Sequence, residues 1–471
     1  MTFALRRAAA TLAAKAALQL SRRLRWGGGT TLPGVVARRL APDLLRELSA
    51  SLPQGVVLVT GTNGKTTTAR MLSSILQAHG LQVLHNRAGA NLLSGLTASA
   101  VTGTDLLGRL HSDIAIFETD EAHVPAAIQE TSPRLVLVLN LFRDQLDRYG
   151  EVDTIARRWR EAFALLPPSS TVVLNADDPG IGSLGEGLAC RVVYYGLQDI
   201  SHGVGAARHT ADSAFCRRCG APLDYAPNFY GHIGHYRCPR CGLVRPEPDV
   251  RLERLVQHGA GPSRLVMSAP STAFEIDLPI PGLYNALNAL AATAATLELN
   301  VPQVQIRQAL EGFTAAFGRI ERFRAADRDV LMALIKNPIG ASETIRMLVG
   351  EPEASGADAP GLQLLIIIND KTADGTDVSW LWDADFERLA GRVGHAIVAG
   401  TRAWDMAVRL KYAGVDPASI EALPELDRAL DRALEHGMAH EPLYLLPTYT
   451  AMLELREELV RRGYVRPFWE S

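Results

Sequence analysis

The sequence predicts an α/β protein built around a parallel-rich sheet, and three observations support this prediction. Short apolar runs bounded by turn residues alternate with helical patterns along most of the chain. One run leads directly into a glycine-rich turn of the kind that binds phosphate. Four cysteines form two C-x-x-C pairs, the pattern of a small metal-binding module inserted among these elements.

The length and net charge of the chain indicate how many domains it has and which partners it is expected to bind. The 471 residues are enough for roughly two to four domains with full hydrophobic cores. The formal net charge of −3 gives no indication of a nucleic-acid partner, since such proteins usually carry an excess of basic residues.

The first 26 residues predict an Arg-rich amphipathic helix. Residues 1–50 contain nine Lys and Arg against two Asp and Glu, which leaves this segment at +7. Three roles stay open: an organelle transit peptide, a basic helix on an anionic membrane surface, or a helix packed against the first domain. We favour the packed helix. No apolar run approaches the ~20 residues that span a bilayer, and we expect a cytoplasmic protein, with contact at the inner face of the membrane left open.

The most informative feature is the turn at 61–67. Residues 56–68 read V-V-L-V-T-G-T-N-G-K-T-T-T, an apolar strand followed by a Gly/Lys/Thr turn and a helix. Glycines allow successive backbone N–H groups to point at a polyphosphate, Lys65 supplies a positive charge for it, and the Thr66 hydroxyl can ligate Mg²⁺. Val59 stands where the general motif has its first glycine, so the match is a variant. We predict that ATP binds here, through Gly61, Thr62, Asn63, Gly64, Lys65, Thr66 and Thr67.

Three later apolar runs, at 113–117, 135–140 and 171–175, predict further strands of the same sheet, with helices at 66–79 and 151–166. Parallel sheets bind ligands beyond the carboxyl ends of their strands, so polar residues at those ends are candidates for the site. These candidates are Glu118, Thr119, Asp120, Glu121 and Asn140.

The cysteine pairs predict a structural zinc ribbon. C-R-R-C at 216–219 and C-P-R-C at 238–241 are separated by eighteen residues, and four thiolates around Zn²⁺ leave no open position for water. Two disulfides are the alternative, but they require an oxidising compartment and the sequence shows no clear secretory signal. The predicted ligands are Cys216, Cys219, Cys238 and Cys241.

A second α/β pattern starts near residue 319, after an Ala-rich helix within 279–297. Its expected strands and final helix lie near 331–335, 362–368, 395–399, 443–446 and 451–461. The acidic stretch 369–387 carries five Asp within sixteen residues. Capping of a helix requires fewer aspartates than this, so we expect a functional role for this stretch.

These patterns divide the chain into three parts. We expect a basic N-terminal helical segment at 1–50 and an ATP-binding central domain at 51–318, into which the zinc ribbon is inserted at 206–247. A C-terminal α/β domain is expected at 319–471.

Taken together, the motifs resemble those of the Mur ligase superfamily, ATP-dependent enzymes that form amide bonds in peptidoglycan synthesis. The resemblance covers nearly all of the chain beyond residue 50, and G-T-N-G-K-T-T at 61–67 is the family's form of the phosphate loop. F-E-T-D-E at 117–121 resembles its strand-end carboxylate, which implies that Glu118 is a Mg²⁺ ligand, directly or through water. N-L-F-R-D-Q-L-D-R-Y-G at 140–150 resembles N-x-x-x-D-H-L-D-x-H-G.

Two further motifs of the family concern the nucleotide. G-L-Y-N-A-L-N-A-L-A-A at 282–292 resembles G-x-H-N-x-x-N-x-x-A-A and implies that Asn285 and Asn288 lie near the nucleotide. F-G-R-I-E-R-F at 317–323 resembles the G-R-x-E junction and implies that Arg319 reaches the phosphates from the C-terminal domain.

The chain departs from the family at several positions. Gln145, Tyr149 and Tyr284 replace histidines, and no lysine follows where several members carry a carbamylated, Mg²⁺-binding lysine. Lys336-Asn337-Pro338 stands where amino-acid-adding members have His-Asn-Pro, and Ala333 takes the place of a ribose-binding Asp. These departures imply a different second Mg²⁺ ligand and disfavour an amino acid as the substrate.

The departures, the Cys₄ insertion and the stretch 369–387 together resemble the MurT-type branch of the superfamily. Its members are synthetase subunits that form a heterodimer with a GatD-like glutaminase and act on lipid II. The resemblance implies that ATP converts the α-carboxylate of D-glutamate in the lipid II stem peptide into an acyl phosphate, from which ammonia forms D-isoglutamine. It implies catalytic roles for Lys65 and Glu118, with Arg319 and Mg²⁺ neutralising charge.

The nitrogen is expected to come from the partner. Four of the five cysteines are assigned to metal and Cys190 has the setting of a small buried hydrophobe, so the chain shows no glutaminase nucleophile of its own. The resemblance implies that the C-terminal domain contacts the glutaminase and that one Asp completes the partner's Cys–His pair. We choose Asp377, with Asp374, Asp383 and Asp385 as alternatives.

Other functions are weighed against this one. A ligase of the Mur or folylpolyglutamate type would add an amino acid, and the missing histidines and lysine argue against it. A zinc-ribbon NTPase that binds nucleic acid would use the arginines around the cysteines, but the isoelectric point of about 6.5 argues against it. A catalytically idle scaffold would retain the phosphate loop only for folding. The arginines in question are Arg217, Arg218, Arg237 and Arg240.

Overall fold

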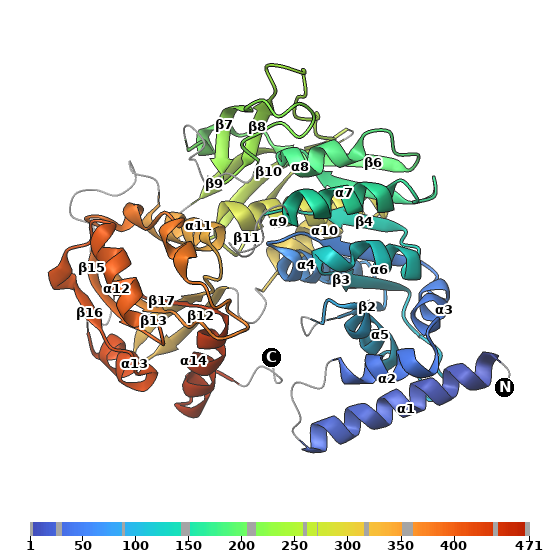
Figure 1. Ribbon diagram of the computed structural model, residues 1–471, viewed down its shortest axis with the longest axis horizontal. Helices are drawn as coiled ribbons and strands as arrows, with labels where there is room; N and C mark the ends of the chain where they lie inside the picture. Colours follow the sequence, from blue (N-terminus) through green and yellow to red (C-terminus); the bar gives the residue numbers. More distant parts are fainter. Residues whose placement is uncertain are drawn as a thin grey trace.

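The computed structural model consists of two large sheets covered by helices (Figure 1). It describes residues 3–24, 31–86, 90–142, 151–204, 213–257, 261–270, 272–314, 320–350, 361–436 and 441–466. The nine-stranded sheet belongs to the first two thirds of the chain, and the six-stranded sheet belongs to the last third.

The nine-stranded sheet has the order β11-β10-β9-β6-β5-β4-β1-β3-β2, and all its pairs are parallel except β9–β10 and β10–β11. Its strands are β1 (Val56–Thr60), β2 (Val83–His85), β3 (Ile114–Glu118), β4 (Leu135–Val138), β5 (Thr171–Asn175), β6 (Arg191–Leu197), β9 (Val250–Gln257), β10 (Ser263–Ala269) and β11 (Thr272–Leu278). β1, β3 and β4 are buried at every residue, which explains their continuous apolar sequences. The four strands predicted for this sheet are confirmed to within two residues.

Two groups of helices cover the two faces of this sheet. One face packs against α4 (Lys65–Ala78), α9 (Leu283–Glu298) and α10 (Gln303–Glu311). The other face packs against α3 (Leu44–Ala50), α5 (Leu93–Thr102), α6 (Val124–Thr131) and α7 (Glu151–Phe163), with α1 (Phe3–Leu24) and α2 (Leu32–Leu40) beyond them. α9 is rich in Ala and almost wholly buried, so it can lie close to both α4 and the sheet.

The basic N-terminal helix packs against the rest of the protein, as expected. α1 lies on α2 and α5 (Figure 1), and Ala10 and Ala14 on its inner face are fully buried. Arg6 Nε donates a hydrogen bond to the carbonyl oxygen of Leu40 at 2.9 Å. Among the helices of the described residues, none is both long and apolar enough to cross a membrane.

The six-stranded sheet has the order β12-β13-β17-β14-β15-β16, and only β12 runs antiparallel to its neighbour. Its strands are β12 (Ile320–Ala325), β13 (Arg328–Ala333), β14 (Leu362–Ile367), β15 (Val393–Ala399), β16 (Ile420–Ala422) and β17 (Leu443–Pro447). α11 (Pro338–Val349) and α12 (Ala403–Tyr412) cover one face, and α13 (Leu426–Glu435) and α14 (Tyr449–Arg461) cover the other.

The cysteine-containing segment leaves the large sheet between β6 and β9 and forms a separate hairpin, β7 (Asp224–Tyr230) and β8 (Ile233–Arg237). Arg346 on α11 donates hydrogen bonds to the carbonyl oxygens of Phe229 and His202, at 2.9 and 2.8 Å. The hairpin is therefore attached to the C-terminal domain as well as to the large sheet. The shorter elements are α8 (Pro179–Gly182), η1 (Glu121–His123), η2 (Ser183–Gly185), η3 (Ile200–His202), η4 (Ser379–Trp382), η5 (Phe386–Leu389) and η6 (Pro417–Ser419).

The contact between α2 and α5 gives a test of this packing. A Cβ atom on Gly34 would lie 1.7 Å from the carbonyl oxygen of Ser94, so we predict that Gly34→Ala separates the two helices. Overpacking of this kind costs about 1–3 kcal/mol, which should appear as a lower unfolding temperature in a thermal melt. Gly312→Ala is the matched control, because its nearest new contact is an ordinary 3.4 Å. Equal melting temperatures for the two variants would contradict the described contact.

Candidate functional site

The turn between β1 and α4 has the backbone that its glycines predict. Gly61 and Gly64 have φ angles of +135° and +86°, which residues with a Cβ atom rarely adopt. A Cβ on Gly64 would lie 2.2 Å from Asn288 Oδ1, and one on Gly61 would lie 2.9 Å from the backbone N and O of Asn140. The loop is thus confined between α9 and the segment that follows β4.

Asn63, at the tip of this loop, is held from two domains. Its backbone N donates to Asn140 Oδ1 at 2.9 Å, and Asn140 Nδ2 donates to its carbonyl oxygen at 3.0 Å. Asn337, from the C-terminal domain, donates through Nδ2 to Asn63 Oδ1 at 3.0 Å and accepts from the Gly340 N–H that begins α11. The loop therefore lies where the two large sheets meet.

Lys65 is buried at the first position of α4, and its charge is balanced by one carboxylate. Lys65 Nζ lies 3.1 Å from Glu121 Oε1 and also donates to the carbonyl oxygen of Gly61. Trp159, fully buried, donates through Nε1 to the carbonyl oxygen of Glu121 at 2.8 Å, which fixes the backbone there. An anion bound in the loop would compete with Glu121 for this ammonium group.

Thr66 and Glu118 form the pair expected to hold Mg²⁺. The Thr66 hydroxyl lies 3.0 Å from both carboxylate oxygens of Glu118, at the end of β3. Asn86 fixes the Glu118 backbone, since its Oδ1 accepts from the Glu118 N–H and its Nδ2 donates to the carbonyl oxygen, both at 2.8 Å. A hydroxyl and a carboxylate are hard oxygen ligands, and Mg²⁺ usually takes few protein ligands while it keeps several waters. The chemistry of these two residues therefore fits Mg²⁺.

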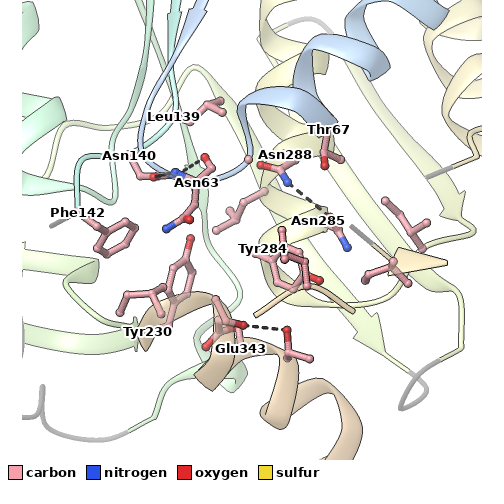
Figure 2. A pocket seen from close by; sticks show the side chains of 18 of the residues that line it. Asn63, Thr67, Leu139, Asn140, Phe142, Tyr230, Tyr284, Asn285, Asn288 and Glu343 are labelled. Carbon is pink, nitrogen blue, oxygen red and sulfur yellow. Dashed lines mark hydrogen bonds between the residues drawn. The ribbon is translucent and has the colours of Figure 1, made fainter. Parts of the chain in front are cut away.

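A pocket opens beside the loop, with walls from both domains (Figure 2). Asn63, Gly64 and Thr67 contribute the loop side. The other labelled residues in Figure 2 are Leu139, Asn140, Phe142, Tyr230, Tyr284, Asn285, Asn288 and Glu343. Lys336 and Ile339 complete the C-terminal wall. The pocket combines aliphatic, aromatic and amide side chains with one lysine and one glutamate, so a few polar groups on a largely apolar wall can orient a ligand.

The asparagines expected near the nucleotide do face this pocket. Asn285 Nδ2 donates to the carbonyl oxygen of Pro281 at 2.6 Å, and Asn288 Nδ2 lies 3.5 Å from Asn285 Oδ1. Their role as nucleotide ligands stays a prediction. Arg319 lies outside the described residues, as does the segment 143–150 with Gln145 and Tyr149.

Some aspartates of the acidic stretch 369–387 are exposed, and others hold neighbouring elements in place. Asp377 is exposed and accepts a hydrogen bond from the Ser379 N–H at 2.8 Å. Hydrogen bonding by the Ser379 side chain, and then by its backbone, lowers the pKa of the Asp377 carboxyl. Asp374 accepts from the backbone N–H of Thr450 at 2.7 Å, so it fixes the start of α14. Asp385 pairs with Arg388 at 2.8 Å, and with Asp383 it lines a second cavity.

The four predicted metal ligands lie together. The cluster consists of Cys216, Cys219, Cys238 and Cys241, with all Sγ atoms within 4.8 Å of one another. Sulfur atoms from different C-x-x-C pairs approach to 3.5 Å, far beyond the about 2.05 Å of a disulfide bond, so the disulfide alternative is wrong. Gly220 and Gly242 close the two turns with φ angles of +72° and +76°. Two such turns with four thiolates fit one tetrahedral metal ion.

The hairpin of this module forms part of the pocket wall. Tyr230 lines the pocket, and the ring of His232 lies 4.4 Å from that of Phe142. His232 Nε2 is 3.2 Å from Asp178 Oδ2, and both side chains are fully buried. Burial alone would raise the pKa of Asp178, but His232 and the backbone N–H of Leu141 hold it below its usual value. The module is therefore fixed to the central domain by a buried polar pair.

Acidic side chains pair with three of the four arginines around the cysteines. Arg217 Nε lies 3.5 Å from Asp153 Oδ1, and Arg218 pairs with Glu186. Arg237 Nε lies 3.4 Å from Asp224 Oδ2. These ion pairs reduce the positive potential that a nucleic-acid phosphate backbone would need.

Some residues of the site are absent from the sequence-based prediction. Asn86 follows β2, a strand of only three residues with no apolar run to reveal it. Tyr230 and Glu343 reach the pocket from an inserted hairpin and from the helix after Lys336-Asn337-Pro338, so only the tertiary structure brings them there. Of these residues, only Asn86 could have been predicted from the sequence, because it is a polar residue directly after a short strand.

Comparisons with known proteins agree with this architecture. The family model of the Mur ligase middle domain matches residues 59–218, and that of the MurT ligase C-terminal region matches residues 334–452. The chain is 35% identical to the lipid II isoglutaminyl synthase (glutamine-hydrolyzing) subunit MurT of Streptococcus pneumoniae, over 94% of this chain and 95% of that one. It is 32% identical to the subunit of the same name from Staphylococcus aureus, over 96% of both chains.

Solved structures share the fold at lower identity. A pseudomurein peptide ligase type C from Methanothermus fervidus has a TM-score of 0.64 at 21% identity, covering 89% of this chain and 80% of that one. MurF from Thermotoga maritima, in complex with ADP, has a TM-score of 0.60 at 15% identity, covering 92% and 85%.

The cysteine cluster gives a test that needs no substrate. We predict one metal ion per chain in the purified protein, and zinc is the ion that four thiolates in this spacing favour. Cys238→Ser should reduce the metal content measured by mass spectrometry and lower the unfolding temperature, because the module is too small to have a large core of its own. Cys190→Ser is the control, since Cys190 lies outside the cluster. Unchanged metal content in Cys238→Ser would contradict the assignment.

Proposed function

The chain belongs to the MurT family of Mur ligases, and on this premise we propose that it is the synthetase subunit of a lipid II isoglutaminyl synthase. In this reaction the α-carboxylate of D-glutamate in the lipid II stem peptide becomes an amide at the expense of ATP. One observation carries the proposal: a phosphate-binding loop faces a pocket whose opposite wall belongs to the MurT-type C-terminal domain.

The loop and its neighbours would hold ATP and Mg²⁺. Successive backbone N–H groups at the start of α4 suit the phosphates, and Lys65 supplies a positive charge close to them. Thr66 and Glu118 would hold Mg²⁺, as their oxygen chemistry suggests. Arg319 is proposed to reach the phosphates from the C-terminal domain.

Activation solves the chemical problem of a carboxylate substrate. A carboxylate repels nucleophiles because it is negatively charged, and transfer of a phosphoryl group to it creates a leaving group. Phosphoryl transfer depends mainly on alignment and on neutralising the charge of the transferred group. Lys65 fits this role because its ammonium group lies at the phosphate loop, where it donates to the carbonyl oxygen of Gly61 and lies 3.1 Å from Glu121 Oε1.

The nitrogen would come from a second subunit. Four of the cysteines lie together in the proposed metal site. Burial raises the pKa of the thiol of the fifth, Cys190, which disfavours the thiolate that a glutaminase needs. The two MurT relatives are named as subunits of glutamine-hydrolyzing enzymes. We therefore propose a GatD-like glutaminase as the partner in a heterodimer, with Asp377 completing its Cys–His pair.

The C-terminal domain carries an exposed apolar surface that supports this partner. Trp404, Val408 and Tyr412 recur at every fourth residue of α12 and are 65%, 47% and 71% exposed. The ring of Trp382 packs against that of Tyr412, with centroids 5.9 Å apart. Exposed aromatic side chains of this density mark protein interfaces. Because Asp377 lies just before η4 in the same part of the domain, a partner docked here could reach it.

The division of the chain follows from these roles. We propose that 51–318 binds ATP, that the module inserted at 206–247 is a zinc ribbon, and that 319–471 contacts the glutaminase. The segment 1–50 is proposed to be a helical extension packed on the central domain, in keeping with the burial of α1.

Replacement of Lys65 tests the role of ATP. Lys65→Ala should lower ADP release and amidation by about 10²–10³-fold, the effect of removing one group that stabilises developing charge. The loss should be the same with glutamine or ammonium as nitrogen source, because both routes need the acyl phosphate. Arg307→Ala, which removes an exposed positive charge from α10, is the control. Robust ammonium-supported turnover in Lys65→Ala would contradict the proposal.

Replacement of Asp377 tests the partner. In the assembled complex, Asp377→Asn should lower glutamine-dependent amidation by a factor on the order of 10⁴, as loss of the third triad member does elsewhere. Ammonium-dependent amidation should persist, because the ATP site is untouched. Asp329→Asn, an equally conservative change at an exposed position of β13, should alter neither activity. Normal glutamine-dependent turnover in Asp377→Asn would show that another residue serves the triad.

A further inference from the structure

A second cavity adjoins the pocket beside the phosphate loop. Its lining runs from the exposed Trp382 and Asp383, at the end of η4, inward to the hairpin and α11. Three residues line both cavities, namely Tyr230, Ile339 and Glu343. The two cavities therefore adjoin at these three side chains, and the outer one reaches the surface near the proposed partner site.

Glu343 is the only ionisable carboxyl group at this junction among the described residues. It lies on α11 and is 6% exposed, yet within the described part of the chain its carboxylate makes no hydrogen bond or ion pair. Figure 2 shows its side chain on the pocket wall near Tyr230 and Tyr284. A buried carboxylate without a partner is costly, so its presence in a cavity wall indicates a ligand.

The neighbouring cations are engaged elsewhere. Arg346, one turn further along α11, donates to the carbonyl oxygens of Phe229 and His202. Arg388 pairs with Asp385 at 2.8 Å. Burial raises the pKa of Glu343, although both arginines oppose this shift. The carboxyl group can therefore accept and release a proton more readily near neutral pH than an exposed glutamate can.

The proposed reaction creates a need for such a group. When ammonia attacks an acyl phosphate, its nitrogen becomes positively charged and must lose a proton before a stable amide forms. Ammonia also arrives from a medium in which ammonium is the abundant species. A carboxylate at the point of entry can bind the nitrogen through its N–H groups and accept the proton.

We propose that Glu343 is the residue that receives the nitrogen nucleophile and takes its proton. This inference rests on the proposed amidation. The nitrogen lone pair forms a bond to the acyl carbon, and a proton passes from nitrogen to a carboxylate oxygen of Glu343. The bond between the acyl carbon and the phosphate oxygen then breaks, and phosphate leaves with that electron pair. The proton afterwards passes from Glu343 to phosphate, so the products are the amide and hydrogen phosphate.

Glu343→Gln tests this role, because the amide has the same shape but cannot accept the proton. The complex is assayed with lipid II, ATP, Mg²⁺ and ammonium chloride, without glutamine. We expect amidation about 100-fold slower than in the parent, the lower end of what general base catalysis contributes. Hydroxylamine, which is largely uncharged at neutral pH, is supplied in a parallel assay. Hydroxylamine is also a much weaker base than ammonia, so its nitrogen loses the proton to water once it has bonded to the acyl carbon and does not depend on Glu343. Trapping of the acyl phosphate as hydroxamate should therefore proceed near the parent rate.

Two further variants complete the design. Glu343→Asp retains the carboxylate on a shorter side chain and should recover part of the ammonium-dependent rate. Glu311→Gln, at an exposed position of α10, is the control and should leave both rates unchanged. The unfolding temperature of Glu343→Gln should not fall, because a neutral amide replaces a buried acid.

The outcomes separate this inference from the function on which it rests. If Glu343→Gln slows the ammonium and hydroxylamine reactions equally, or slows neither, the role of Glu343 is refuted while the synthetase function stands. If the parent complex forms neither amide nor hydroxamate, the proposed function itself fails.

Discussion

The proposed chemistry depends on the phosphate loop at 61–67, whose backbone is fixed by contacts from three other segments of the chain. Asn140 fixes its backbone from the end of β4, Asn288 closes over Gly64 from α9, and Asn337 reaches Asn63 from the second sheet. Each neutral hydrogen bond contributes only about 1 kcal/mol to stability, so its main effect here is on geometry. A loop already fixed in this shape needs little reorganisation when it binds an anion, which is how preorganised sites stabilise charge.

The cysteine-containing module supports the same site from the side. Its hairpin carries Tyr230 into the pocket, and the buried pair of His232 and Asp178 fixes the hairpin to the central domain. Arg346 on α11 donates to the carbonyl oxygens of Phe229 in the hairpin and of His202 in η3. Four thiolates around a metal would stiffen a segment whose own hydrophobic core is small. We infer that the module is a wall of the pocket rather than a nucleic-acid contact, because Arg217, Arg218 and Arg237 are paired with acidic residues.

The sequence predicts those features that are local. The apolar parallel strands, the turn at Gly61 and Gly64 and the spacing of the cysteines each depend on a few consecutive residues. The antiparallel strands β9 to β11 are not predicted, because their partly exposed, charged sequences lack an apolar run. The cavity junction is not predicted either, since Tyr230 and Glu343 are more than a hundred residues apart in sequence. Such proximity follows only from how the two domains and the insertion pack.

One helix, α11, contacts the phosphate loop, the junction of the two cavities and the cysteine-containing module. Asn337 at its N-terminal cap contacts the phosphate loop, Glu343 in its second turn lines the junction of the two cavities, and Arg346 anchors the module. A shift of α11 would therefore change the loop, the cavity junction and the pocket wall together. Because α11 packs against η4 and η5, a partner docked near Trp382 contacts elements that touch this helix directly. The fold thus gives a physical route that couples binding of the proposed partner subunit to the phosphate loop.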